Sequence, residues 1–377
     1  MLPQIIKDEI ISQSPEMLIL LEAIALRPSP SWHEDKRVEF CENWLKKAGC
    51  EGVYVDDEYN VIYPYHVTDD RPIVAFAAHT DVVFPDMDRF RIKEDAERIY
   101  CPGIYDDSVN LANILLAARL VTQHQFKPKD CGILFICDSC EEGMGNLAGM
   151  RKVFETYGKR IEEFYSFDLV YNEIVNKAVG SGRFKVTART EGGHSYLAFG
   201  NENAIQRMSA FIQELYATKL PDAGKCTFNA GTITGGTSVN TIAQECTLLC
   251  EYRADTARGM RLMDRLFRRL FEKYHLEFEI IGMRPGESLN SAAKDTREAM
   301  LENAESIIES ITGSKPERVS SSTDCNIPLS LGIPAICVGT CEGGGAHTRE
   351  EYLEKSSLIP GRLIATELVL GYCDTDV

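Results

Sequence analysis

The residues best suited to chemistry are His79 and Asp81, which directly follow the apolar run at residues 72–78. The run is short, apolar and uninterrupted, which predicts a buried strand. Because side chains alternate along a strand, His79 and Asp81 should point to the same face. A neutral imidazole is a good zinc ligand, and a nearby carboxylate can fix its tautomer. By itself the pair is more typical of a polar loop. A metal site therefore requires further ligands from other parts of the chain.

Acidic residues also end two later apolar runs. The run at 131–137 leads into Glu141 and Glu142, and the run at 164–167 leads into Asp168. Strands that alternate with helices predict a mostly parallel sheet. Ligands of such sheets bind at the carboxyl ends of the strands. We therefore expect these acids to converge with His79 in space.

Two further segments supply candidate ligands from loops. Asp106 and Asp107 lie in a Gly- and Pro-containing loop ahead of an apolar helix predicted at 109–121. One of the two can cap that helix, which leaves the other for a different role. His347 lies in a glycine-rich segment that follows a strand predicted at 334–338.

Together these segments form a set of nitrogen and oxygen donors that suits a divalent ion such as zinc. Two such ions would lie about 3.5–4 Å apart and would need one bridging carboxylate and a bridging water. The doubled glutamate adds a division of labour, because one member could ligate while the other acts as general base. The set comprises His79, Asp81, Asp106, Glu141, Glu142, Asp168 and His347.

The composition excludes several classes of protein. The 377 residues are 44% hydrophobic and 26% charged, which is ordinary for a globular chain of two domains. A net charge of -17 argues against nucleic-acid partners and against anionic membrane surfaces. We find no signal peptide and no apolar run near the roughly 20 residues that span a bilayer.

The cysteines point to a reducing compartment. Thirteen cysteines, an odd number, are scattered through predicted strands and helices, which favours free thiols and a cytoplasmic location. Cys137 and Cys140 have the spacing of a redox motif, but two buried thiols at a strand end are the simpler interpretation.

The texture of the chain predicts two domains. Residues 1–177 and 286–377 have the alternating pattern of an α/β fold, a mostly parallel sheet flanked by helices. Residues 178–285 read instead as half-exposed antiparallel strands with two helices. We therefore expect an inserted α+β domain within a catalytic α/β domain.

The chain resembles the co-catalytic zinc peptidases and deacylases that include peptidase T, glutamate carboxypeptidase, aminoacylase and acetylornithine deacetylase. The likeness extends over most of the chain, in both order and spacing. It rests on Ala78-His79-Thr80-Asp81, Gly103 to Asp107, Glu141-Glu142-Gly143, Asp168, Gly193-His194-Ser195, Asn240 and Ala346-His347-Thr348, with Pro28 to Ser31 and Glu34 near the N-terminus.

The resemblance implies a ligand set for two Zn²⁺ ions per subunit, with Co²⁺ or Mn²⁺ able to occupy the same site. One metal would be held by His79, Asp106 and Asp168. The other would be held by Asp106, Glu142 and His347, so that Asp106 bridges the two ions.

The resemblance also implies catalytic roles. Asp81 would orient His79, and Glu141 would be the general base that activates the metal-bridging water. His194, on the inserted lid and dimerisation domain, would stabilise the oxyanion and often reaches the partner's site in a homodimer. Asn240 and Arg253 are candidates for binding the substrate's carboxylate or backbone, although Arg253 fits a strand-end ion pair equally well.

The sequence thus predicts a metal-dependent hydrolase of amide bonds, most simply a di- or tripeptidase that acts from a free terminus. An N-acyl-amino-acid deacylase is the alternative, because both activities use the same metal centre. A non-catalytic binding relative is the remote alternative. Tyr196 stands where the family usually has a small residue, and Cys140 directly precedes the glutamate pair, so both bear on substrate choice.

Overall fold

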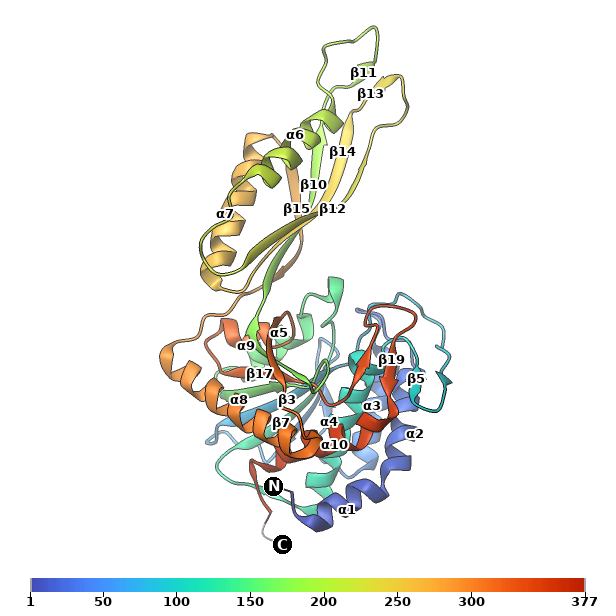
Figure 1. Cartoon of the computed structure of the whole chain (residues 1–377), viewed down its shortest axis with the longest axis vertical. Helices are drawn as coiled ribbons and strands as arrows, with labels where there is room; N and C mark the ends of the chain where they lie inside the picture. Colours follow the sequence, from blue (N-terminus) through green and yellow to red (C-terminus); the bar gives the residue numbers. More distant parts are fainter. Residues whose placement is uncertain (1, 376–377) are drawn as a thin grey trace. The chain divides into compact units, whose positions relative to one another are not determined.

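The chain folds into two compact units, seen here in a computed structural model that describes residues 2–375 (Figure 1). Unit 2 consists of Ala178–Ser288, and unit 1 consists of the described residues before and after it. Each unit encloses its own hydrophobic core.

Unit 1 is built on an eight-stranded sheet whose central four strands are parallel, which confirms the expected α/β class. Antiparallel strands flank the parallel centre. In spatial order the strands are β1 (Tyr54–Val55), β2 (Val61–Tyr65), β7 (Gly132–Asp138), β3 (Ile73–His79), β8 (Ile161–Ser166), β17 (Ala335–Val338), β9 (Glu173–Ala178) and β16 (Glu317–Ser321).

Helices cover both faces of this sheet (Figure 1). One face carries α3 (Asp35–Lys47), α4 (Val109–His124), α8 (Ser291–Thr312) and α10 (Leu358–Leu370), with α1 (Gln4–Ser12) packed against α10 and α2 (Ser14–Ala25) packed against α4. The other face carries α5 (Ala148–Tyr157) and α9 (Asn326–Ser330). Because α4 is sandwiched between the sheet and other helices, it is apolar nearly all round, as its sequence predicts.

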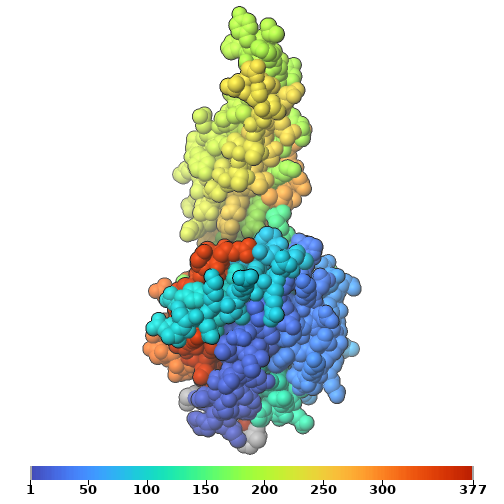
Figure 2. Space-filling view, turned by 90° about the vertical axis from the view of Figure 1, so that its right-hand side faces the viewer, coloured from blue at the N-terminus to red at the C-terminus, as the bar shows by residue number. Residues whose placement is uncertain are grey.

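A small second sheet joins distant parts of unit 1. It consists of β4 (Lys93–Glu94), β5 (Arg98–Tyr100), β19 (Tyr352–Glu354) and β18 (Gly343–Gly344). Segments near residues 90 and 350 accordingly lie side by side on the surface in Figure 2. Strands of two or three residues carry no periodic signal, so the sequence did not predict them.

Unit 2 has a β-α-β-β-α-β order with an antiparallel sheet β12-β14-β10-β15. Helices α6 and α7 cover the face that carries its core, which explains the alternating strand pattern. Its elements are β10 (Gly180–Arg189), β11 (Gly193–His194), α6 (Ala204–Ala217), β12 (Cys226–Gly235), β13 (Thr241–Ile242), β14 (Glu245–Ala254), α7 (Ala257–Lys273) and β15 (Glu277–Arg284).

Two further findings concern the chain as a whole. Within residues 2–375, every helix is too short or too polar to cross a lipid bilayer. All thirteen cysteines are buried free thiols, Cys137 and Cys140 among them.

Candidate metal centre

The carboxyl ends of three parallel strands meet at one place in unit 1. His79 ends β3, Glu141 and Glu142 follow β7, and Asp168 follows β8. These strands are neighbours in the order β7-β3-β8, so their carboxyl ends lie at the same edge of the sheet. Asp106 enters from the turn η1 (Ile104–Ser108) ahead of α4, and His347 enters from the loop between β18 and β19.

Asp106 stands between the two histidines. Its Oδ1 lies 3.2 Å from His79 Nε2, and its Oδ2 lies 3.2 Å from His347 Nε2. His347 Nε2 is also 3.1 Å from Glu142 Oε1. Two groups of potential ligands therefore share Asp106, each with its donor atoms within 4.8 Å of one another: His79, Asp106 and Asp168, and Asp106, Glu142 and His347.

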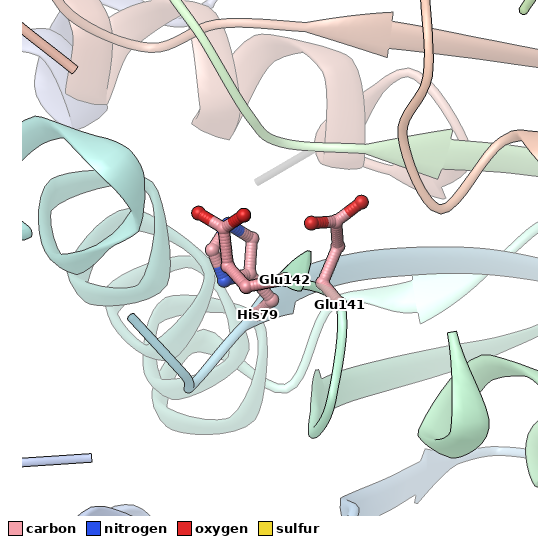
Figure 3. A group of neighbouring side chains, drawn as sticks. All are labelled: His79, Glu141 and Glu142. Atoms are coloured by element: carbon pink, nitrogen blue, oxygen red, sulfur yellow. The ribbon is translucent and has the colours of Figure 1, made fainter. Parts of the chain in front are cut away.

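The position of Glu141 differs from that of its neighbour. Figure 3 shows the side chain of Glu142 overlapping His79, whereas Glu141 stands to one side with its carboxylate turned in the same general direction. Glu141 also forms a compact group with His79 and Glu142. Both carboxylates thus reach the cluster, and only Glu142 also belongs to a group that contains Asp106.

The residues present fit a divalent metal. In a tetrahedral site with metal–ligand bonds of 2.0–2.1 Å, ligand atoms are separated by roughly 3.3 Å. The nitrogen–oxygen distances of 3.1–3.2 Å around Asp106 match the edges of such a polyhedron. Imidazole and carboxylate donors are those that zinc and similar ions accept in proteins.

The negative charge of the cluster also favours a bound cation. Burial and the charge of Asp106 raise the pKa of Glu142 to about 8 and that of Asp168 to about 7. Hydrogen bonds to Asp106 and Glu142 raise the pKa of His347 to about 11. Several buried carboxylates thus lie close enough to disfavour one another's charge, and a divalent ion would offset that negative charge.

Asp81 connects the cluster to the backbone of the glutamate pair. Its carboxylate accepts the backbone N–H of Glu141 and of Glu142, both at 2.9 Å, and the hydroxyl of Ser31 at 2.6 Å. The Nδ1 of His79 lies 3.0 Å from the Asp81 carbonyl oxygen and 3.4 Å from its carboxylate. Asp81 is fully buried, so one side chain fixes the positions of three cluster residues.

We predict that Asp81→Asn weakens metal binding and turnover by about 10- to 100-fold. The amide presents an N–H group where the carboxylate accepts two backbone N–H groups, so one of those bonds becomes a donor–donor clash. Metal affinity measured by competition with a chelator, together with kcat/KM, tests this. Asp57→Asn is the matched control, because Asp57 is exposed on the surface. Wild-type affinity in Asp81→Asn would contradict the prediction.

Two buried carboxylates support the cluster through hydrogen bonds from the backbone. The family resemblance pointed to Glu34, whereas nothing in the sequence marked Glu351. The buried carboxylate of Glu351 accepts the backbone N–H groups of Gly103, Tyr105 and Asp106 at 2.7–3.1 Å, which holds the turn that presents Asp106. Glu34 accepts the backbone N–H of Cys140 at 3.0 Å, directly before the glutamate pair. No local pattern marks such contacts, since the partners are more than a hundred residues apart.

Asp107 does not cap α4, contrary to one expectation. Neither Asp107 nor Ser108 makes a side-chain capping bond to this helix. Asp107 instead accepts the backbone N–H of His79 at 3.0 Å and the amide of Asn110 at 2.7 Å. Its carboxylate therefore holds the backbone at the end of β3, where the ligand His79 lies.

Two further buried carboxyl groups, those of Asp138 and Asp324, lie next to each other near the cluster. Asp138 ends β7, Asp324 precedes α9, and both are fully buried. Burial raises the pKa of Asp138 to about 7, and burial together with the charge of Asp138 raises the pKa of Asp324 well above its usual range. A raised pKa stabilises the fold at low pH, and this stability is lost as the pH rises through 7.

We therefore predict that Asp138→Asn makes the free energy of unfolding less sensitive to pH. A buried carboxyl group with a pKa near 7 loses its proton between pH 6 and pH 8, which lowers the free energy of unfolding by about 1.4 kcal/mol. The amide of the variant does not titrate in this range. Unfolding in urea at pH 6 and pH 8 measures the difference for wild type and variant, and an equal loss in both proteins would refute the idea.

The three candidate residues of unit 2 fall into two places. His194 pairs with Thr241 across β11 and β13, and the Asn240 carbonyl accepts the backbone N–H of Ser195, so His194 and Asn240 lie close together. Arg253 lies near the other end of β14, where its guanidinium pairs with Glu251 at 2.8 Å. Glu245, the first residue of β14, and Arg253 are eight residues apart along the strand, which corresponds to about 26 Å.

The ring of His194 has a defined tautomer. Its Nδ1 accepts the backbone N–H groups of Tyr196 at 3.3 Å and Leu197 at 3.5 Å. In the neutral ring the proton therefore sits on Nε2, which can donate a hydrogen bond outward. Three strongly exposed apolar residues follow this histidine in the sequence: Tyr196, Leu197 and Phe199.

Comparison with known proteins gives consistent likenesses. A family model described as Peptidase family M20/M25/M40 matches residues 75–371. Acetylornithine deacetylase from Myxococcus xanthus is 25% identical over 321 residues, which cover 80% of this chain and 81% of that protein. Succinyl-diaminopimelate desuccinylase from Nitrosospira multiformis is 24% identical over 368 residues, covering 91% and 94% respectively.

Solved structures share the fold. Aminopeptidase PepT from Bacillus cereus has a TM-score of 0.74 at 19% identity, and a tripeptidase from Staphylococcus aureus has a TM-score of 0.75 at 18% identity. In both cases the match covers 94% of this chain and 98% of the other.

Proposed function

Because the chain belongs to peptidase family M20/M25/M40, we propose that it is a dinuclear zinc exopeptidase that hydrolyses an amide bond of a di- or tripeptide. The observation that carries this proposal is the place of Asp106, whose two carboxylate oxygens face different histidines. His79, Asp106 and Asp168 would hold one ion, and Asp106, Glu142 and His347 would hold the other. Co²⁺ and Mn²⁺ suit the same donors.

The proposed reaction divides the work among the side chains. Bound metal ions would polarise the amide carbonyl and lower the pKa of water at the site. Glu141 would accept a proton from the attacking water and pass it to the nitrogen of the leaving amine. His194 would donate its Nε2–H to the oxyanion, and Asn240 would bind the substrate's backbone or carboxylate. Asp81 would hold the backbone of Glu141 and the ring of His79 in their positions.

Arg253 has two candidate roles. Its guanidinium pairs with Glu251 at 2.8 Å near the end of β14, and it could also bind the substrate's carboxylate. Arg253→Ala separates these roles, because loss of substrate binding raises KM, whereas loss of the ion pair alone leaves KM close to that of wild type.

An N-acyl-amino-acid deacylase is the second candidate, favoured by the names of the deacetylase and desuccinylase relatives. A panel of di- and tripeptides and of N-acetyl amino acids, assayed with Zn²⁺-, Co²⁺- or Mn²⁺-loaded protein, separates the two. Turnover of the peptides supports the first proposal. Turnover of the acyl compounds alone would overturn it in favour of the deacylase, and turnover of neither would reject both.

We also propose a homodimer that forms through unit 2 and acts in the cytoplasm. Edge strand β12 has ten residues without a charge or a proline, so it lacks the common devices that keep an exposed edge from pairing. The thirteen free thiols fit a reducing compartment.

The edge strand makes the dimer testable. We predict that Ile233→Lys, which places a charge on the exposed edge, shifts the protein from dimer to monomer. Light scattering coupled to size-exclusion chromatography measures the mass, and Ile5→Lys in α1 is the control. A monomeric wild type would reject the proposal, as would a variant that stays dimeric.

A further inference from the structure

Two large apolar side chains lie exposed beside the buried ligand cluster of unit 1. Trp32 is 56% exposed and Met144 is 60% exposed. Trp32 directly follows Ser31, and Met144 comes two residues after Glu142. Neither contributes a ligand or a proton to the proposed reaction, so their exposure requires another explanation.

Specific contacts tie both residues to the cluster. The Ser31 hydroxyl donates to the carboxylate of Asp81 at 2.6 Å and lies 3.4 Å from the carbonyl oxygen of Glu142. The indole N–H of Trp32 then donates to the carbonyl oxygen of Met144 at 3.3 Å. One short segment thus reaches from the N-terminal part of the chain across the glutamate loop.

The backbone at Trp32 is in an unusual conformation. Its φ of 71° lies in the left-handed region, which bulky residues rarely adopt. Such conformations persist where surrounding contacts hold them, commonly at functional sites. Here the contacts of Ser31 on one side and of the indole on the other keep the ring at the surface.

The backbone of Met144, which the Trp32 indole contacts, lies within the length of a substrate side chain from the cluster. Consecutive Cα atoms are about 3.8 Å apart, so the Cα of Met144 lies within about 8 Å of that of Glu142. A Leu or Phe side chain next to an amide held at the cluster extends over a similar distance. An indole face and a flexible thioether are surfaces on which apolar groups of varied shape pack well.

We infer that Trp32 and Met144 form a subsite for an apolar side chain of the residue next to the scissile amide, so that the substrates are short peptides or acyl amino acids with residues such as Leu or Phe. The inference rests on the proposed function of the metal centre. A second protein copy is a poorer occupant, because two side chains offer far less than the roughly 800 Å² that each partner buries in a stable interface.

Turnover of matched substrates tests the subsite. The panel is Gly-Xaa, Xaa-Gly and N-acetyl-Xaa, with Xaa as Ala, Leu, Phe or Asp. We expect Trp32→Ala and Met144→Ala each to lower kcat/KM about tenfold for the Leu and Phe compounds, with less than a threefold change for the Ala compounds. Ile19→Ala in α2, which is 67% exposed, is the control. An equal loss for all substrates, or no loss for any, would overturn the inference.

Fluorescence gives a readout that does not depend on turnover. The chain has two tryptophans, so Trp44→Phe leaves Trp32 as the only indole. In a Trp44→Phe, Glu141→Gln protein, Gly-Phe or Phe-Gly should shift the emission to shorter wavelength, whereas Gly-Asp and Asp-Gly should not. Failure of the proposed function would appear as a wild type that turns over none of the panel. A shift that is the same for all peptides, or a change of oligomeric state in Trp32→Ala without a change in specificity, would count against the subsite.

Discussion

Replacing Glu141 by glutamine should lower kcat about a thousandfold or more while the bound metal stays in place. A glutamine amide has the size of the carboxylate but cannot accept a proton at neutral pH, so it cannot act as the general base. The metal should remain because the two ligand groups that share Asp106 use Glu142 and not Glu141. Elemental analysis of the purified protein and steady-state kinetics give the two quantities.

The same experiment distinguishes the two glutamates. Glu141 also forms a compact group with His79 and Glu142, so a ligand role for it is chemically possible. Loss of metal in Glu141→Gln would assign it that role and remove it as the base. We expect the opposite pattern in Glu142→Gln, with loss of metal together with activity. Glu155→Gln, on the exposed side of α5, is the control for the substitution itself.

Asp106→Asn should abolish the binding of both metal ions. Its two carboxylate oxygens each lie 3.2 Å from a different histidine, so one side chain serves both groups of ligands. The amide presents an N–H donor to one ion and a neutral oxygen to the other, so one ion loses its ligand and the other loses the negative charge that attracts it. Metal content should fall from about two ions per chain to less than one, with turnover lost to the same degree.

Two comparisons sharpen this test. Asp168→Asn removes a residue that belongs to one group only, so it should release one ion and keep the other. Thermal unfolding adds a second measure, because a ligand that binds only the native state raises Tm. Added Zn²⁺ should raise the Tm of chelator-treated wild type and leave that of Asp106→Asn unchanged. A metal-free wild type that retains full turnover would overturn the proposed mechanism.

The position of Asp106 depends on a contact with a residue far away in the sequence. The turn that presents it is held by Glu351, which lies about 245 residues later in the chain. Burial and the charge of Asp106 raise the pKa of Glu351 to about 7. The carboxylate that positions the shared ligand is therefore itself part of the unbalanced negative charge that a cation would offset.

The amino-acid sequence was sufficient to predict the α/β fold and a cluster of potential metal ligands. Donor residues at the ends of short apolar runs are local features, and the parallel arrangement of β7, β3 and β8 brings them to one edge of the sheet. The apolar character of α4 predicted its burial on all sides. The donor types alone suggested a divalent metal, since histidine and carboxylates at such positions suit few other ligands.

The contacts among these residues depend on the three-dimensional fold, although the family resemblance already implied that Asp106 bridges two ions and that Asp81 orients His79. Local sequence could not place Asp106 between two histidines, aim the carboxylate of Asp81 at the backbone of Glu141 and Glu142, or turn Asp107 from the helix toward His79. Each of these contacts joins segments more than 25 residues apart. Their geometry follows from packing between elements, which periodicity and motif spacing do not encode.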